Sequence, residues 1–170
     1  MKNICLKVAA ALALCVSLAS CSEDEDMTLL TFHSATSRGI ISDLSRTSIT
    51  LPVSGVETIY ENEQFMYSGD ISQVDLAQVK LPDGSPLTVF MFTCNDRGKR
   101  RLYTATASNM GGSIVVLYGG KPLAFRKIDV VISDGILLAV PELPEGTDLF
   151  KELEKIRESV KNVNEYKKDL

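Results

Sequence analysis

The 170-residue sequence has no tryptophan, a single histidine and four cysteines. A zinc site needs about three or four ligands from His, Cys, Asp and Glu, and none cluster around His33, so we expect neither a metal nor a cofactor. The sequence has no Gly-x-Gly-x-x-Gly and no phosphate-binding loop ending in Gly-Lys-Ser/Thr. Gly119-Gly120-Lys121 is followed by Pro122 and fits a hairpin turn better.

Basic residues do not outnumber acidic ones. There are 18 lysines and arginines against 22 aspartates and glutamates, a net charge of −4. Residues 1–20 hold two of the lysines and no acid, which leaves 16 basic and 22 acidic residues beyond them, a net charge near −6. A nucleic-acid partner needs a basic face for its phosphates, so we expect no such partner.

The N-terminal apolar run is too short to cross a membrane. It covers residues 8–18, whereas a transmembrane helix needs roughly 20 apolar residues. Lys2 and Lys7 precede the run, Leu18-Ala19-Ser20-Cys21 ends it, and Ser22-Glu23-Asp24-Glu25-Asp26 follows. The tetrapeptide resembles the lipobox of bacterial lipoproteins, and residues 1–20 resemble a lipoprotein signal peptide.

The lipoprotein resemblance implies cleavage just before Cys21 and attachment of diacylglyceryl and acyl chains, such as palmitate, to that residue. Stable attachment needs more than one chain, so Cys21 would anchor the protein to the membrane of the cell envelope. We expect the outer membrane, on its periplasmic side or at the cell surface. Residues 21–27 are then either a solvated acidic tether or a surface-export signal of the kind found in some Gram-negative bacteria.

Residues 28–170 are enough for one domain with a proper core and too few for two. Cys94 is the one cysteine in this range, so no disulfide within it is expected. Its position in the apolar run 87–94 favours a buried, inert thiol over a reactive or intermolecular one.

Alternating apolar residues and turn residues predict a β-rich domain. Two early strands are indicated around residues 30–32 and 49–53, with a loop between them, whereas residues 64–71 show no clear period. Later residues predict two hairpins and a further strand. These cover 74–81 with a central strand at 87–94, 113–118 with 123–131, and 136–140.

Two helices are predicted. The first begins at Asn95 or Asp96, runs to about Asn109 and ends at Gly111, with Leu102, Ala105 and Thr106 facing inward. The second begins at residues 147–148 and carries an apolar stripe, which consists of Leu149, Leu153, Ile156, Val160 and Val163. The order of elements predicts an α+β fold, in which two main helices pack against an antiparallel or mixed sheet.

The first turn of the first helix is unusually basic. Arg97, Lys99, Arg100 and Arg101 lie at the positive pole of the helix, where positive charge is unfavourable, and Gly98 costs this turn some stability. The four cations are either a solvated face or an interaction surface for an acidic partner or lipid headgroups.

Part of the chain resembles the first periplasmic (head) domain of the SecD/SecDF protein-export subunits. The resemblance covers roughly residues 65–160, most clearly 87–140. It is carried by Phe92 to Gly98, Leu102, Thr106, Asn109 and Gly111, by Ile114-Val115-Val116-Leu117, and by Gly120-Lys121 and Ile132-Ser133-Asp134-Gly135. Gly119 and Leu123-Ala124-Phe125 depart from the family pattern. No transmembrane helices follow the leader, so the resemblance implies at most the soluble head.

Two kinds of function fit the sequence. The first is a lipid-anchored, non-catalytic protein-interaction module that contacts polypeptides or an envelope complex, as an accessory to protein export or envelope assembly. The alternative is an envelope hydrolase whose site combines Ser and Asp side chains with His33. We expect the first, or more simply a structural envelope lipoprotein, and we expect no catalytic residues.

Overall fold

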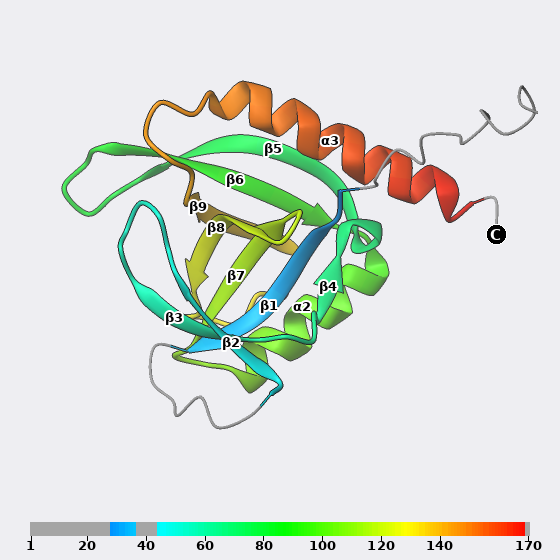
Figure 1. Cartoon of the computed structure of the whole chain (residues 1–170), viewed down its shortest axis with the longest axis horizontal. Helices are drawn as coiled ribbons and strands as arrows, with labels where there is room; N and C mark the ends of the chain where they lie inside the picture. The colour runs from blue at the N-terminus through cyan, green and yellow to red at the C-terminus, as the bar shows by residue number, and fades with distance from the viewer. Residues whose placement is uncertain (1–27, 37–43, 169–170) are drawn as a thin grey trace, which may run out of the picture.

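The structure, a computed structural model, describes residues 28–36 and 44–168. The signal peptide, the acidic tether and Cys21 lie outside the described residues. The described chain forms a nine-stranded sheet, two α-helices and one 3-10 helix (Figure 1). The strands are β1 (Leu30–Thr36), β2 (Arg46–Thr50), β3 (Glu57–Glu61), β4 (Met66–Tyr67), β5 (Ile71–Lys80), β6 (Pro86–Cys94), β7 (Ser113–Tyr118), β8 (Lys121–Lys127) and β9 (Ile136–Pro141). The helices are η1 (Ser68–Asp70), α2 (Asp96–Ser108) and α3 (Leu149–Tyr166).

The predicted α+β fold is confirmed, and all strand pairings are antiparallel. The strand order is β2-β3-β1-β7-β8-β9-β6-β5, and β4 pairs with β1 beside β3. The sheet curves strongly, so that β5 and β6 arch over β1 and β7 (Figure 1). The strands at the two ends of this order are β2 and β5.

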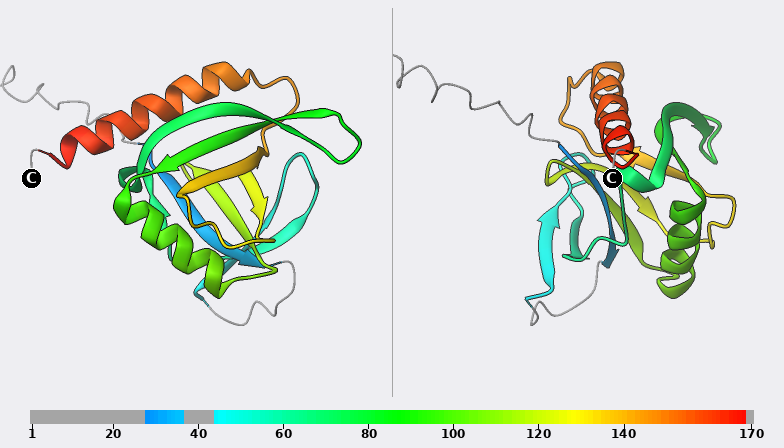
Figure 2. Two further views of the ribbon diagram at one scale, coloured as in Figure 1. Left: turned by 180° about the vertical axis from the view of Figure 1, so that it is seen from behind. Right: turned by 90° about the vertical axis from the view of Figure 1, so that its right-hand side faces the viewer.

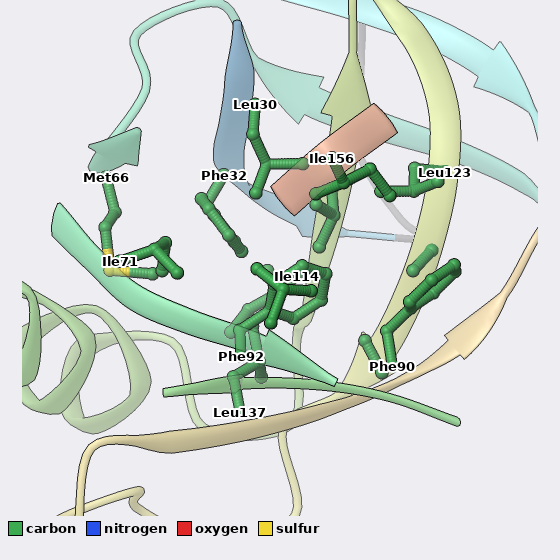
Figure 3. Close-up of a cluster of buried hydrophobic side chains, with 14 of the residues drawn as sticks. Leu30, Phe32, Met66, Ile71, Phe90, Phe92, Ile114, Leu123, Leu137 and Ile156 are labelled. Carbon is green, nitrogen blue, oxygen red and sulfur yellow. The ribbon is translucent and has the colours of Figure 1, made fainter. Parts of the chain in front are cut away.

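The main core lies inside this curve. Side chains from β1, β6, β7, β9 and α3 converge there (Figure 3). Phe32 and Phe92 are fully buried, and their rings meet edge to face with centroids 5.3 Å apart. Burying one side chain of this size contributes about 1.5–3 kcal/mol.

Helix α3 covers the β5 end of the curved sheet. It lies across β5 and also contacts η1 and β1. Asp148 caps its N-terminus by accepting hydrogen bonds from Phe150 N and Lys151 N at 3.0 and 3.3 Å. The predicted stripe faces the core, with Leu153, Ile156, Val160 and Val163 buried and Leu149 partly buried.

Helix α2 packs against η1, β4 and one end of β6. Asn95 is its N-cap and accepts hydrogen bonds from Arg97 N and Gly98 N at 3.1 and 3.0 Å. The predicted inward residues are confirmed, because Leu102, Ala105 and Thr106 are buried. Gly111 follows the helix with φ +82°, the left-handed conformation expected of it.

Several elements differ from the sequence predictions: strand β3 was not predicted, and β1 and β2 extend into the predicted loop between them. The early strand ends at Thr50 rather than near Val53, because Gly55 N bonds to Leu51 O and turns the chain. Strand β8 ends at Lys127 rather than residue 131, because Lys127 pairs with Ser113, the first residue of β7. Residues 64–71 contain β4 and η1, which are too short to show a period.

Strand β6 is central, as predicted, and lies between β5 and β9. Phe90 and Phe92 face the main core, and Val89 is also buried. Met91 and Thr93 are half-buried, so the second face of β6 is only partly covered.

Candidate functional site

The face of the sheet that points away from the main core carries a second, smaller apolar cluster. Its buried members are Ala35, Val115 and Leu117, and partly buried Ile49, Tyr60 and Phe125 pack against them. The β2–β3 hairpin supplies Ile49 and Tyr60 and lies on the opposite side of β1 from α2 (Figure 2).

An open groove of about 520 Å³ lies beside this cluster. Leu117 is part of the groove, and Leu29, 40 % exposed, lines it near the start of β1. The other lining residues come from β1, β3, the segment after β3 and the β7–β8 turn; they are Thr28, Thr31, His33, Tyr60, Asn62, Gln64, Gly119 and Gly120. The mixture of exposed apolar surface and side-chain amides suits an extended polypeptide better than a charged small molecule.

The β2–β3 hairpin that forms one wall is fixed at both ends. At its tip, the buried Glu142 carboxylate accepts hydrogen bonds from Val53 N and Ser54 N at 3.0 and 3.1 Å. At its base, Asn62 accepts a hydrogen bond from Thr47 Oγ1 at 2.6 Å and donates one to Leu44 O at 2.9 Å. These contacts hold the wall in one position.

His33 lines the groove, but both ring nitrogens are already engaged. Nδ1 lies 2.8 Å from Glu61 O, and Nε2 lies 3.0 Å from Thr31 Oγ1. A carbonyl oxygen only accepts, so Nδ1 carries the proton and a neutral ring accepts from the Thr31 hydroxyl. Burial lowers the pKa of His33 and favours this neutral form, although the bond to Glu61 O opposes the shift.

The ring also packs edge-on against Tyr60, with centroids 5.1 Å apart. Its hydrogen bonds join β1 to the chain where β3 leaves the sheet, before Phe65 N returns to bond with Phe32 O at 3.0 Å. Neither ring nitrogen of His33 contacts a Ser or Asp side chain within the described chain. This geometry gives the ring a positioning role in the groove wall.

The basic residues predicted as an interaction surface separate into two groups. Arg97 Nε lies 2.5 Å from Asp70 Oδ1, and Arg101 NH1 lies 2.9 Å from Asp70 Oδ2. The Asp70 side chain is fully buried. Lys99 and Arg100 are exposed and make no ion pair within the described chain.

Asp70 explains why the first turn of α2 is basic. A buried carboxylate is costly unless it is paired and hydrogen-bonded, and two arginines from one helix turn supply that pairing. Arg97 also donates to the Tyr67 hydroxyl at 3.1 Å, and this hydrogen bond lowers the pKa of Tyr67. Arg97 and Arg101 thus fasten α2 to η1, which leaves Lys99 and Arg100 as the freer part of the predicted surface.

Arg100 borders a second open groove, of about 400 Å³, between α2 and β1. Phe65 and Ala105 also line it, and Asn109 donates to Ser34 Oγ across it at 3.1 Å. This groove is smaller than the one at His33.

Cys94 fits the predicted inert thiol. It is partly buried against the main core, and its Sγ lies 3.7 Å from Met66 Sδ. Burial, reinforced by the negative charges of Asp70 and Asp134, raises the pKa of Cys94 to about 12. The thiolate needed for nucleophilic attack is therefore scarce at neutral pH.

In residues 28–36 and 44–168, no three His, Cys, Asp or Glu side chains lie close enough together to hold a metal ion. In the same ranges, no helix combines the length and apolar character needed to span a bilayer. Asp70 and Asp75 pair with different arginines: Asp70 with Arg97 and Arg101, and Asp75 with Arg157.

Comparison with known proteins gives similarity at the level of fold. No family model matches the chain, and no curated protein matches its sequence. The chain is similar to a solved structure of SecDF, a membrane component that enhances protein export, with 13% identity over 78% of this chain and 61% of that one and a TM-score of 0.49. A second, SecDF in a super-membrane-facing form, gives 14% identity over 79% and 18% and a TM-score of 0.48. The chain therefore spans less than two thirds of either SecDF chain.

Proposed function

We propose that this protein is a lipid-anchored, non-catalytic interaction module of the cell envelope, and that the groove beside His33 binds a partner polypeptide. The observation that carries the proposal is the groove on the outer sheet face, beside the small apolar cluster. Exposed Leu29 and buried Leu117 lie in one groove with the amide side chains of Asn62 and Gln64. A backbone-binding groove combines apolar surface with hydrogen-bonding groups in this way.

The position of the groove agrees with attachment at Cys21. Thr28, which lines the groove, is seven residues after Cys21. Seven residues span at most about 24 Å when fully extended. A lipid anchor at Cys21 would thus keep the groove close to the membrane surface, where it would meet polypeptides that leave or enter the bilayer. In the cell, such a module would serve as an accessory to protein export or envelope assembly.

Site-specific photo-crosslinking in intact cells tests the groove. A photoreactive residue in place of Leu29 should yield covalent adducts with polypeptides. The matched control replaces Val130, which is 55 % exposed, apolar and outside the groove. Adducts at neither position, or the same adducts at both, would refute the groove as a polypeptide site. Mass spectrometry of the adducts decides between an export component and another envelope complex.

Membrane attachment is tested separately. We expect Cys21→Ala to release the protein from the membrane fraction, and intact-mass analysis of the native protein to show acylation at Cys21. An unmodified Cys21 with residues 1–20 still attached would contradict the lipid anchor and leave the groove to be judged on the crosslinking alone.

A further inference from the structure

The two end strands of the sheet differ in whether other parts of the protein bond to their outer backbone groups. At the β5 edge, side chains of α3 bond to the strand's free carbonyl groups. Arg157 Nε donates to Val74 O at 2.8 Å and Asn164 Nδ2 donates to Ile71 O at 2.9 Å. At the other edge, no described strand pairs with β2 on its outer side. An uncovered edge strand is a template for pairing with another chain.

The register shows which β2 groups are available. Asn62 N donates to Ser45 O at 2.7 Å, and the same register pairs Thr47 with Tyr60 and Ile49 with Thr58. Bonded and non-bonded pairs alternate in antiparallel ladders, so residues 45, 47 and 49 bond inward to β3. The N–H and C=O groups of Arg46, Ser48 and Thr50 therefore point away from the sheet.

Side-chain contacts hold the β2–β3 hairpin, and with it the outer edge of β2, in one position before any partner binds. Glu142 fixes the tip of the β2–β3 hairpin, and Asn62 fixes its base, as described above. An added strand would pair with a hairpin that is already in place, which lowers the ordering cost of binding.

The two faces of β2 present different chemistry to an added strand. On one face, Ile49 belongs to the small apolar cluster. On the other, Ser48 Oγ donates to Glu57 at 3.2 Å, and Glu57 and Glu61 are exposed without an ion pair within the described chain. A lysine or arginine opposite Ser48 would be two strand spacings, about 9.6 Å, from the β3 backbone at Glu57, a distance that the two long side chains together can bridge across Ser48.

We propose that the free edge of β2 binds an extended segment of a partner polypeptide by strand addition, with apolar side chains toward Ile49 and basic side chains toward Glu57. Backbone groups of Arg46, Ser48 and Thr50 supply the hydrogen bonds, and the two faces supply selectivity. This inference rests on the proposed function, because it adds a binding mode and a partner chemistry to the interaction module.

The experiment uses the full chain in detergent and a fluorescent peptide of alternating valine and lysine. Saturable binding is measured by anisotropy. A peptide of the same sequence that is N-methylated at every backbone amide is the ligand control, because it cannot donate ladder hydrogen bonds. We expect the methylated peptide to bind at least about 10-fold more weakly.

Ser48→Pro is the decisive protein variant. Proline removes an N–H that points outward and is tolerated on edge strands, so β2–β3 pairing should persist while peptide binding falls at least about 10-fold. Ser48→Ala keeps the N–H and should bind like wild type. Glu57→Gln should weaken the valine-lysine peptide but not a valine-threonine one.

Hydrogen exchange gives a readout that does not depend on any variant. Bound peptide should slow exchange of the Arg46, Ser48 and Thr50 amides, whereas Thr47 and Ile49 are protected already. Absence of saturable binding, or equal binding by wild type and Ser48→Pro, would overturn strand addition at β2. So would a wild-type dimer that dissociates in Ser48→Pro, since the edge would then serve a second copy. Crosslinking at Leu29 is independent of these outcomes, so the edge and the groove can fail separately.

Discussion

The Asp70 carbonyl oxygen lies so close to Gly98 that a Cβ atom on that glycine would fall less than 3.0 Å from it. The same oxygen accepts a hydrogen bond from Asn95 N at 2.9 Å. Gly98 is therefore the point where α2 approaches η1 backbone to backbone. The helix accepts a poor helix former in its first turn because a side chain there would separate the two elements.

We predict that Gly98→Ala destabilises the protein even though alanine is the better helix former by about 1 kcal/mol. The Cβ would collide with backbone atoms of Asp70, which cannot rotate away, and the overpacking penalty is about 1–3 kcal/mol or more. Urea unfolding followed by circular dichroism measures the change. Arg100→Ala on the exposed face of α2 is the control and should lie within about 0.5 kcal/mol of wild type. A Gly98→Ala protein as stable as wild type would contradict this account.

We predict that Asp70→Asn costs about 1.5–3 kcal/mol, because it removes the buried carboxylate whose charge-assisted hydrogen bonds Arg97 and Arg101 share. Asp75→Asn is the matched control at the partly exposed pair with Arg157 and should cost about 1 kcal/mol or less. Thermal and chemical unfolding measure both. Equal losses in the two variants would show that Asp70 is an ordinary surface partner.

We predict that the protein loses stability as the pH falls below 6.5. The pKa of His33 is lowered from its ordinary value of 6.5, so the unfolded chain takes up a proton before the folded one does. Neutral His33 contributes its full share to the free energy of unfolding above pH 6.5. This share is lost as the pH falls from 6.5 through the folded-state pKa of His33. His33→Gln keeps a side-chain donor for Glu61 O and should flatten this part of the pH profile of Tm. An unchanged profile would exclude His33 as its source.

We predict that Cys94 reacts at least about 100-fold more slowly with a water-soluble maleimide in the folded protein than in urea at pH 7.5. A thiol with a pKa of about 12 has little thiolate at that pH, and its partial burial limits access. Mass spectrometry of the Cys94 peptide over time measures the rate. Rapid labelling under native conditions would contradict the inert interpretation.

Local sequence signals were sufficient wherever a structure depends on neighbouring residues. The N-cap at Asn95, the left-handed turn at Gly119-Gly120, the apolar stripe of α3 and the hairpin of β5 and β6 all follow from short-range periodicity and turn chemistry. These local elements are enough to predict the α+β class without any tertiary contact. The lipobox at Cys21 is likewise a property of sequence alone and remains a prediction.

The groove and the role of the basic turn required the tertiary structure. His33 gave no signal beyond being the one histidine, because its partners Glu61 and Tyr60 are nearly thirty residues away in a segment of weak alternation. Arg97 and Arg101 looked like free surface charge, because Asp70 lies in residues with no period.

The sequence by itself predicted both α-helices, the two later hairpins and their turns, since these depend on residues a few positions apart, but it did not predict β3, β4 or η1. The tertiary structure alone decided which side chains meet across the curved sheet, which charges are paired and which sheet edge is left open. Those outcomes depend on packing between segments distant in the chain, whose pairing no local pattern encodes.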